Sequence, residues 1–171
     1  IVCPTSLVGN WQSEINKFAS NLKITTVFGA ARSDQLQQLS QADCILTTGG
    51  MSVGEEDYVR TEAEALGELE FCKIAMKPGK PFAQGVINGT PFFGLPGNPV
   101  AALVCSLIFA RPAMGILSGA GWSEPQGFDV PAGFSKRKKA GRREYLRARM
   151  RDGHAEVFAS EGSGRISGLS W

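Results

Sequence analysis

Two hydrophobic periods alternate along the first hundred residues, and this alternation constrains the fold more than any other feature of the chain. Strand-like segments occur at residues 1–3, 22–28, 43–48 and 69–76. Between them, apolar residues recur every three or four positions, as a helix requires; an example is the series Trp11, Ile15 and Phe18. Strands that alternate with helices build parallel sheets with crossover helices. The sequence therefore predicts a three-layer, doubly wound α/β domain over residues 1–118.

Short polar residues mark where the first predicted helices begin. Ser6 or Asn10 can cap the first helix, and Ser33 can cap a short polar helix over residues 33–41. A third helix is expected over about residues 56–66. Each of these helices lies between two predicted strands, which is the place of a crossover connection.

The most apolar helix of the chain follows a rigid turn. Asn98 is a good N-cap residue and Pro99 suits the first helical position, so this helix should run to about Ala110. Arg111-Pro112 should end or kink it. Residues 119–127 hold four Gly or Pro residues and are interpreted as a linker.

Two dipeptides predict β-hairpins. Asn88-Gly89 lies within residues 82–95 and Asp152-Gly153 within residues 128–171, and both suit a type I′ turn, whose central residues need a positive φ. The second hairpin should place Arg149 opposite Glu156 on one face. Its other face should be apolar, made of the pairs Met150–Ala155, Ala148–Val157 and Leu146–Ala159. A lone hairpin is marginal in water, so this part must lean on the first domain or have more strands.

Composition excludes several classes of protein. With 43% hydrophobic and 20% charged residues the chain can bury a core, which disfavours disorder and fibrous repeats. The longest apolar run, residues 100–110, is shorter than the roughly 18 residues of a bilayer span, so no membrane segment or signal peptide is expected. Four widely spaced cysteines are expected as buried, reduced thiols of a cytoplasmic protein: Cys3, Cys44, Cys72 and Cys105.

Charge is distributed unevenly along the chain. Nine basic residues and one acid, Glu144, lie between Lys136 and Arg151, whereas the remainder carries nine bases and fifteen acids. The near-neutral total of +2 is therefore the sum of a basic run and an acidic remainder. The run could contact nucleic acid or another polyanion, but a solvated loop is the commoner explanation.

A glycine-rich segment follows the third predicted strand. Residues 47–54 are Thr-Thr-Gly-Gly-Met-Ser-Val-Gly and lead toward a helix, and ligands of open α/β sheets bind at such carboxyl ends. Glycines let backbone N–H groups face an anion, and Ser52 adds a hydroxyl donor. The alternative is a tight strand-to-helix turn without a ligand.

Three carboxylates, Glu55, Glu56 and Asp57, follow this loop directly. They could hold Mg²⁺, which takes one or two carboxylates together with water and phosphate oxygens. Acids in the first turn of a helix also stabilise it, so a purely structural role is the alternative.

Two proline-rich turns complete the candidates. The segment Lys77-Pro78-Gly79-Lys80-Pro81 places two lysines on a stiff loop, which favours oxyanion binding over an ordinary surface turn. Pro96-Gly97-Asn98-Pro99 delivers a helix N-terminus, and simple capping is the alternative there. Other chemistries are disfavoured, because the only histidine, His154, lies far along the chain and neither a P-loop nor GxGxxG occurs.

Three of these segments, in this order, resemble the molybdopterin molybdotransferases of molybdenum cofactor biosynthesis, the family that includes the gephyrin E domain. The segments are residues 47–54 followed by Asp57-Tyr58, residues 76–81, and residues 94–100. The resemblance extends over about residues 42–171. It implies the second half of the family's molybdopterin-binding α/β domain, followed by a small C-terminal β domain that is cut short.

The resemblance also implies a chemistry. Enzymes of this family take adenylylated molybdopterin and molybdate, insert molybdenum at the dithiolene sulfurs and release AMP, with a divalent cation such as Mg²⁺. Their active sites form at a dimer cleft, so a homodimer is one expected partner, whereas a membrane or a nucleic acid is not expected.

Roles can be carried over residue by residue. The resemblance implies Asp57, Lys77 and Lys80 as catalytic residues, with the lysines facing molybdate or phosphate. It implies a cation at Glu55 and Asp57, although Glu55 stands where the family usually has Asp. The residues implied to bind substrate, by cradling the pterin phosphate or shaping the pocket, are Gly49, Gly50, Ser52, Gly54, Pro78, Gly79, Pro96, Gly97, Asn98 and Pro99.

The first thirty residues depart from this family, which has a strand and then an active-site Thr-Gly-Asp-Glu-Leu. Here the segment 3–11 is Cys-Pro-Thr-Ser-Leu-Val-Gly-Asn-Trp, and with residues 14–19 it resembles the segment after the nucleotide loop in Swi/Snf-type helicase-like ATPases. We therefore consider a chimera that joins residues 1–41 from an ATPase-like parent to a molybdotransferase fragment. The alternatives are a nucleic-acid-associated ATPase fragment and a noncatalytic product of fold recombination.

Overall fold

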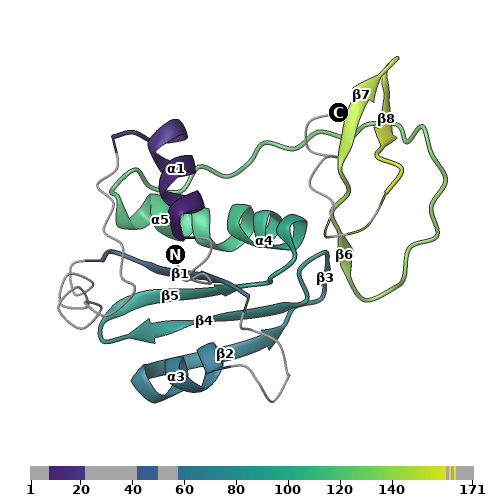
Figure 1. Ribbon diagram of the computed structural model, residues 1–171. Helices are drawn as coiled ribbons and strands as arrows, with labels where there is room; N and C mark the ends of the chain where they lie inside the picture. Colours follow the sequence, from purple (N-terminus) through teal and green to yellow (C-terminus); the bar gives the residue numbers. More distant parts are fainter. Residues whose placement is uncertain (1–7, 22–41, 50–57, 161, 163, 165–171) are drawn as a thin grey trace.

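A four-stranded sheet with helices on both faces forms the centre of the chain (Figure 1). The computed structural model describes residues 8–21, 42–49, 58–160, 162 and 164. The strand order is β1-β5-β4-β2, where the strands are β1 (Ile45–Thr48), β2 (Gly67–Lys73), β4 (Pro81–Ile87) and β5 (Thr90–Leu95). The predicted α/β class is confirmed.

The sheet is mixed, whereas the alternating pattern predicted a parallel one. β1 runs parallel to β5, but β4 is antiparallel to both β5 and β2. The hairpin at Asn88-Gly89 is the physical reason, because a two-residue turn can join only antiparallel strands. The predicted hairpin is confirmed, with φ values of 49° at Asn88 and 82° at Gly89.

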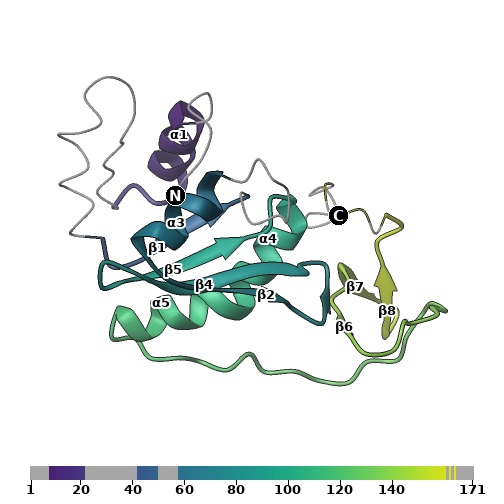
Figure 2. The same cartoon turned by 90° about the horizontal axis from the view of Figure 1, so that it is seen from below.

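The two faces of the sheet carry separate cores. On one face, Ala83 and Phe92 pack with Ala63 of α3 (Tyr58–Leu66). On the other face, Phe82 and Leu95 pack with the long helix that begins at Pro99. Side chains alternate along a strand, so neighbours such as Phe82 and Ala83 enter different cores. Figure 2 shows α3 and the long helix on opposite sides of the sheet, as in the predicted three-layer arrangement.

One helical span, Pro99–Leu117, covers the second face, and it is longer than the sequence predicted. It consists of α4 (Pro99–Cys105), a π-helical segment η3 (Ser106–Ala110) and α5 (Arg111–Leu117). We expected Arg111-Pro112 to end or kink the helix, and the helix does not end there. The backbone N–H of Arg111 bonds to the carbonyl of Ser106, five residues earlier. This wider turn gives room to the Pro112 ring, which has no N–H to donate and otherwise clashes with the preceding turn.

This helical span also has the length and composition of a membrane-crossing helix. It has 19 residues and a mean hydropathy of 2.0. One such helix is a weak indication, because the core helix of a soluble protein passes the same test. Val100, Ala101, Cys105 and Ala110 are buried on its inner side. The expectation of no membrane segment rested on the shorter run 100–110 and stays a prediction.

The N-terminal helix is present as predicted. α1 spans Val8–Phe18, so Asn10 lies inside the helix and is not its cap. Trp11 and Phe18 are 36% and 73% exposed, so the apolar face of α1 is uncovered by the described residues. The predicted elements at residues 1–3, 22–28 and 33–41, and the alternative cap Ser6, lie outside the described residues.

The predicted strand 69–76 is divided into two strands. β2 ends at Lys73, and β3 (Met76–Lys77) leaves the sheet to pair in parallel with β6 (Arg143–Glu144). The backbone N–H of Ile74 donates to the carbonyl of Lys80 at 2.8 Å and closes the intervening turn. β3 therefore connects the α/β part to the C-terminal β part.

The second hairpin has the predicted register. In β7 (Ala148–Arg151) and β8 (His154–Val157), Arg149 pairs with Glu156 and Met150 with Ala155, while the expected Leu146–Ala159 pair falls outside the ladder. Its apolar face is not a core, since Met150 is 53% exposed. Backbone bonds hold the hairpin instead: Ala155 N–H donates to Pro131 O, and Gly133 N–H to Ala155 O, each at 2.9 Å. The hairpin leans on the rest of the chain, as a two-stranded unit requires.

Residues 119–127 contain no helix or strand and are exposed. That is compatible with the expected linker, and the division into domains drawn there stays a prediction. Among the cysteines, Cys105 is fully buried, while Cys44 and Cys72 are only half-buried, and all three are free thiols. The expectation of uniform burial is therefore wrong for these two, and Cys3 lies outside the described residues.

Candidate functional site

The carboxyl ends of β1 and β5 lie side by side and bring two of the candidate segments into contact. Thr48 pairs with Leu95 in the parallel register, and the Gly49 N–H donates to the Leu95 carbonyl at 3.0 Å. Gly97 packs directly on Gly49, because a Cβ added to Gly97 would lie 3.4 Å from the Gly49 Cα. The start of the glycine loop and the Pro96–Pro99 turn therefore share one edge of the sheet, where open α/β sheets bind ligands.

Thr47 holds the start of the glycine loop. Its side chain is 1% exposed, and its hydroxyl donates to the Gly49 carbonyl at 3.2 Å. Gly49 itself has a φ of 92°, a conformation that favours glycine. The remaining candidates of this loop and its carboxylates lie outside the described residues: Gly50, Ser52, Gly54, Glu55 and Asp57.

Asn98 occupies the N-cap position of α4 and Pro99 follows it, as predicted. The Asn98 side chain makes no capping hydrogen bond and is exposed. Pro96 is buried, whereas Gly97 and Pro99 are exposed. The capping interaction offered as the structural alternative is therefore not made by the Asn98 amide, which faces solvent next to the two contacting glycines.

The lysine turn is supported by the helix that starts at this edge. Lys77 and Pro78 are half-buried and joined by a cis peptide bond, Gly79 is buried, and Lys80 is exposed. The Cys105 thiol of α4 donates to the Gly79 carbonyl, with 3.7 Å between Sγ and O. Burial raises the pKa of Cys105 to about 11, so the thiol keeps its proton at neutral pH. The lysine turn thus rests on the helix that the Pro96–Pro99 turn begins.

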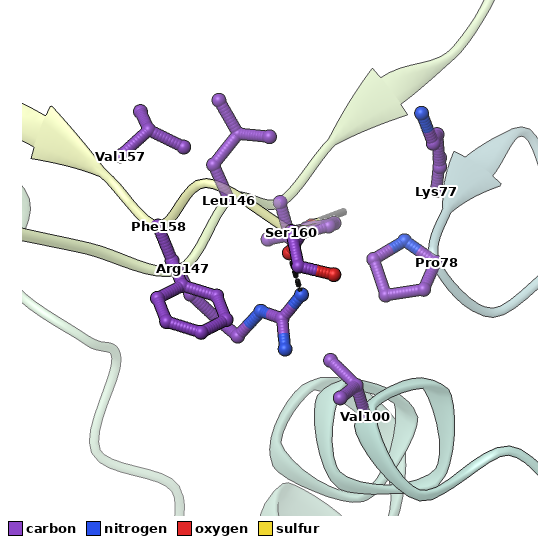
Figure 3. Close-up of a pocket in the computed structure, with 9 residues that line it drawn as sticks. Lys77, Pro78, Val100, Leu146, Arg147, Val157, Phe158 and Ser160 are labelled. Atoms are coloured by element: carbon purple, nitrogen blue, oxygen red, sulfur yellow. Dashed lines mark hydrogen bonds between the residues drawn. The ribbon is translucent and has the colours of Figure 1, made fainter. Parts of the chain in front are cut away.

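A small cavity lies between the lysine turn and the C-terminal β part (Figure 3). Its volume of about 20 Å³ suits a single water molecule rather than an organic ligand. Lys77, Pro78 and Val100 line it from the α/β part. The C-terminal part contributes Tyr145, Leu146, Arg147, Val157, Phe158 and Ser160. Lys80 does not line it, so the two lysines of the turn have different surroundings.

Arg147 is the main residue of this region that sequence reasoning missed. Its guanidinium donates to the Ser160 carbonyl and lies 5.1 Å from the centroid of the Phe158 ring. The register of the second hairpin, extended by one pair, sets Arg147 opposite Phe158, and the Phe158 N–H bonds to the Arg147 carbonyl at 3.0 Å. That local signal could not show that both residues would line the same cavity as Pro78.

A larger concavity of about 460 Å³ lies over β2 and β4, and none of the candidate residues lines it. Its walls include Glu68 and Glu70, which repel an anion. The part of the chain that the structure describes holds no group of three His, Cys, Asp or Glu side chains suited to a metal ion. The contact between the two glycines and the lysine turn therefore remain the best-supported site, and the lysine ammonium groups suit an oxyanion.

Together these features define an α/β domain that gathers the start of a glycine loop, a Pro-Gly turn and a lysine turn at the carboxyl edge of its sheet. Residues 29–115, just over half of the chain, match the family described as "Probable molybdopterin binding domain". The chain belongs to this family, which confirms the resemblance at that level.

Curated relatives agree with this assignment. The chain is similar to a molybdopterin molybdenumtransferase of Haemophilus influenzae, at 44% identity over 109 residues, which is 63% of this chain and 27% of the relative. It is also similar to the molybdenum cofactor synthesis protein cinnamon of Drosophila melanogaster, at 32% identity over 82% of this chain and 24% of the relative. The chain therefore spans about a quarter of the length of these relatives.

Solved structures show the same fold. A molybdopterin biosynthesis MoeA protein of Pyrococcus horikoshii matches 82% of this chain and 34% of its own, with a TM-score of 0.56 and 25% identity. A second structure from this organism covers 99% of this chain and 40% of its own, with a TM-score of 0.61 and 22% identity, which shows the fold alone.

The family match also bears on the N-terminal segment. It begins at residue 29, inside the range 1–41 that we assigned to an ATPase-like parent. Residues 29–41 are thus accounted for by the molybdopterin-binding family. These matches give the Swi/Snf resemblance and the chimera no support.

Proposed function

We propose that this chain is the molybdopterin-binding part of a molybdopterin molybdotransferase and binds adenylylated molybdopterin at the carboxyl edge of β1 and β5. The observation that carries the proposal is the contact of Gly49 with Gly97, beside the helix that supports the lysine turn. Glycines without Cβ atoms allow a phosphate group to approach the backbone closely, and the nearby ammonium groups offset its charge.

In the intact parent, the proposed reaction is insertion of molybdate at the dithiolene sulfurs with release of AMP. Lys77 and Lys80 would bind the molybdate or phosphate oxygens, and Asp57 would act beside them. Gly50, Ser52 and Gly54 would extend the phosphate cradle that Gly49 begins. Mg²⁺ at Glu55 and Asp57 belongs to the same proposal, and would supply charge neutralisation at the phosphate.

Titration of the full chain with adenylylated molybdopterin tests this proposal. We expect a dissociation constant below about 1 mM, and loss of most of this affinity in Lys80→Ala and Asp57→Ala. Lys73→Ala is the matched control for the lysine variant, because Lys73 is an exposed lysine on β2 outside the turn. Binding that survives Lys80→Ala and Asp57→Ala in folded protein would contradict the proposed site.

A homodimer and a cytoplasmic location are further parts of this proposal. Light scattering of the purified chain measures the first, and cell fractionation the second. The chimera remains a separate hypothesis. Salt-sensitive DNA binding by the chain would favour the alternative of a nucleic-acid-associated ATPase fragment. A cooperative thermal unfolding transition without any ligand binding would favour the alternative of a noncatalytic product of fold recombination.

A further inference from the structure

Glu144 is a buried carboxylate at the junction of the two parts of the chain. It lies in β6, where its Cα pairs with that of Lys77 in β3, and the next residue's N–H donates to the Lys77 carbonyl at 2.8 Å. The Glu144 side chain is 6% exposed. An ionised carboxylate in such a place is costly unless cations and hydrogen bonds compensate it.

Three basic residues from two segments lie around this carboxylate, namely Lys77 of the lysine turn with Lys136 and Arg142 of the basic run. Arg142 donates from Nε and Nη2 to Oε1, at 3.0 and 2.8 Å. Lys136 places its Nζ 3.6 Å from Oε2. Burial by itself would raise the pKa of Glu144, but the hydrogen bond and charge of Arg142, with the charges of Lys77 and Lys136, outweigh it and lower the pKa. Glu144 is therefore an anion at neutral pH.

The two oxygens of Glu144 are used differently. Oε1 carries both hydrogen bonds from Arg142, whereas Oε2 is buried and accepts no hydrogen bond in the structure. The Lys136 ammonium, 3.6 Å away, is the cation paired with Oε2, so the carboxylate joins Arg142 and Lys136 through different oxygens.

Lys77 is the residue that links this cluster to the proposed site. It belongs to the lysine turn and lines the small cavity. Figure 3 shows its ammonium end turned away from the Arg147 guanidinium. Glu144, on the neighbouring strand, is thus a carboxylate whose charge interacts with that of Lys77.

We propose that Glu144 is a positioning residue of the anion site, and that its buried carboxylate gathers Lys77 and Lys136 so that lysines from two distant segments act on one oxyanion. This inference rests on the proposed function, since it takes Lys77 as a ligand of phosphate or molybdate oxygens. It adds Lys136, from the C-terminal basic run, to the groups that recognise the anion.

Inorganic pyrophosphate is a suitable probe, titrated calorimetrically into the full chain at low ionic strength. Simple electrostatics predicts that Glu144→Gln strengthens binding, because a negative charge is removed near the anion. Positioning predicts the opposite sign, and we expect the dissociation constant to rise about five- to tenfold. Glu156→Gln is the matched control, because it is the same change at a hairpin side chain that is 39% exposed. It should change the dissociation constant for pyrophosphate by less than about twofold.

Lys136→Gln gives a second test that leaves the Glu144 side chain itself unchanged. We expect a rise in the dissociation constant of about fivefold or more. Lys138→Gln, an exposed lysine of the same run, should have less than half the effect on log Kd. Glu144→Asp keeps the charge and should recover part of the affinity lost in Glu144→Gln.

The outcomes separate this inference from the proposed function. If wild type does not bind pyrophosphate, or Lys77→Ala and Lys80→Ala leave binding unchanged, both fail. If those lysine variants weaken binding while Lys136→Gln has no more effect than Lys138→Gln, the positioning role of Glu144 is refuted alone. Tighter or unchanged binding by folded Glu144→Gln refutes it as well.

Discussion

Gly79→Ala tests whether the lysine turn and α4 are packed as one unit. A Cβ at Gly79 would lie 2.5 Å from Cys105 Sγ and 3.3 Å from Met76 Cε, and the backbone φ of 108° disfavours any side chain. The first distance is shorter than a van der Waals contact permits, so the turn or the helix has to move. Either movement displaces the lysines or loosens the core around Cys105.

Two physical costs contribute to the expected loss of stability. Holding alanine in this part of φ/ψ space costs about 1–3 kcal/mol, and overpacking a filled core costs about 1–3 kcal/mol more. We therefore expect Gly79→Ala to lower the free energy of unfolding by about 2–6 kcal/mol. Cys105→Ala removes only the sulfur and should cost about 1–2 kcal/mol.

The double variant separates the two costs. Without Sγ the clash is relieved, so Gly79→Ala/Cys105→Ala should be more stable than the sum of the single changes predicts, by about 1–3 kcal/mol. Urea unfolding followed by far-ultraviolet circular dichroism measures all four free energies. Gly89→Ala is the matched control: its φ is 82°, and a Cβ there meets nothing within 4 Å. It should carry the backbone cost alone and add to Cys105→Ala without coupling.

Strict additivity of Gly79→Ala and Cys105→Ala would refute this reasoning. It would mean that the turn yields independently of the helix, and that the thiol does not support the lysine turn. A coupling of equal size between Gly89→Ala and Cys105→Ala would refute it too, because Gly89 follows the end of β4 opposite to the Gly79 turn that Cys105 contacts.

Two further predictions concern charge and thiol reactivity. The hydrogen bond from Arg149 and the nearby charges of Arg149 and Arg151 lower the pKa of Glu156 from its usual 4.5, although partial burial opposes them. This stabilisation is present above pH 4.5 and is lost as the pH falls through the lowered pKa. The difference in melting temperature between wild type and Glu156→Gln should therefore shrink as the pH is lowered below 4.5. A constant difference down to pH 3 would contradict this reasoning. Cys105 is fully buried with a pKa of about 11, so at pH 8 it should react with a thiol reagent far more slowly than half-buried Cys44 and Cys72. Time-resolved peptide mass spectrometry measures the three labelling rates. Labelling of Cys105 before the other two would contradict its burial.

Local signals predicted much of the fold. The hairpins at Asn88-Gly89 and Asp152-Gly153 were predictable because a two-residue turn with positive φ sets its own register. The start of the long helix was predictable because Asn98 and Pro99 suit its first positions whatever surrounds them. The three segments of the candidate site were identified by their residue types, and the contact of Gly49 with Gly97 follows from the parallel pairing of β1 with β5.

Where the sequence predictions failed, a non-local contact decided the outcome. Pro112 ends an isolated helix, but here the π turn before it relieves the clash, while the core formed with the sheet keeps the helix in place. The apolar pairs of the second hairpin suggested a buried face, but that face depends on a partner element that the described residues do not provide.

The sequence by itself determined the turns, the helix starts and the inventory of the site: two lysines on a stiff loop, a glycine loop and a Pro-Gly turn. Only the tertiary structure decided which of these residues act together. The pairing of β3 with β6 brings Glu144, the ion-pair partner of Lys136, next to Lys77, and the packing of α4 brings Cys105 to Gly79. Both contacts join residues far apart in the chain, and their energy depends on desolvation and close packing that no local pattern of residues records.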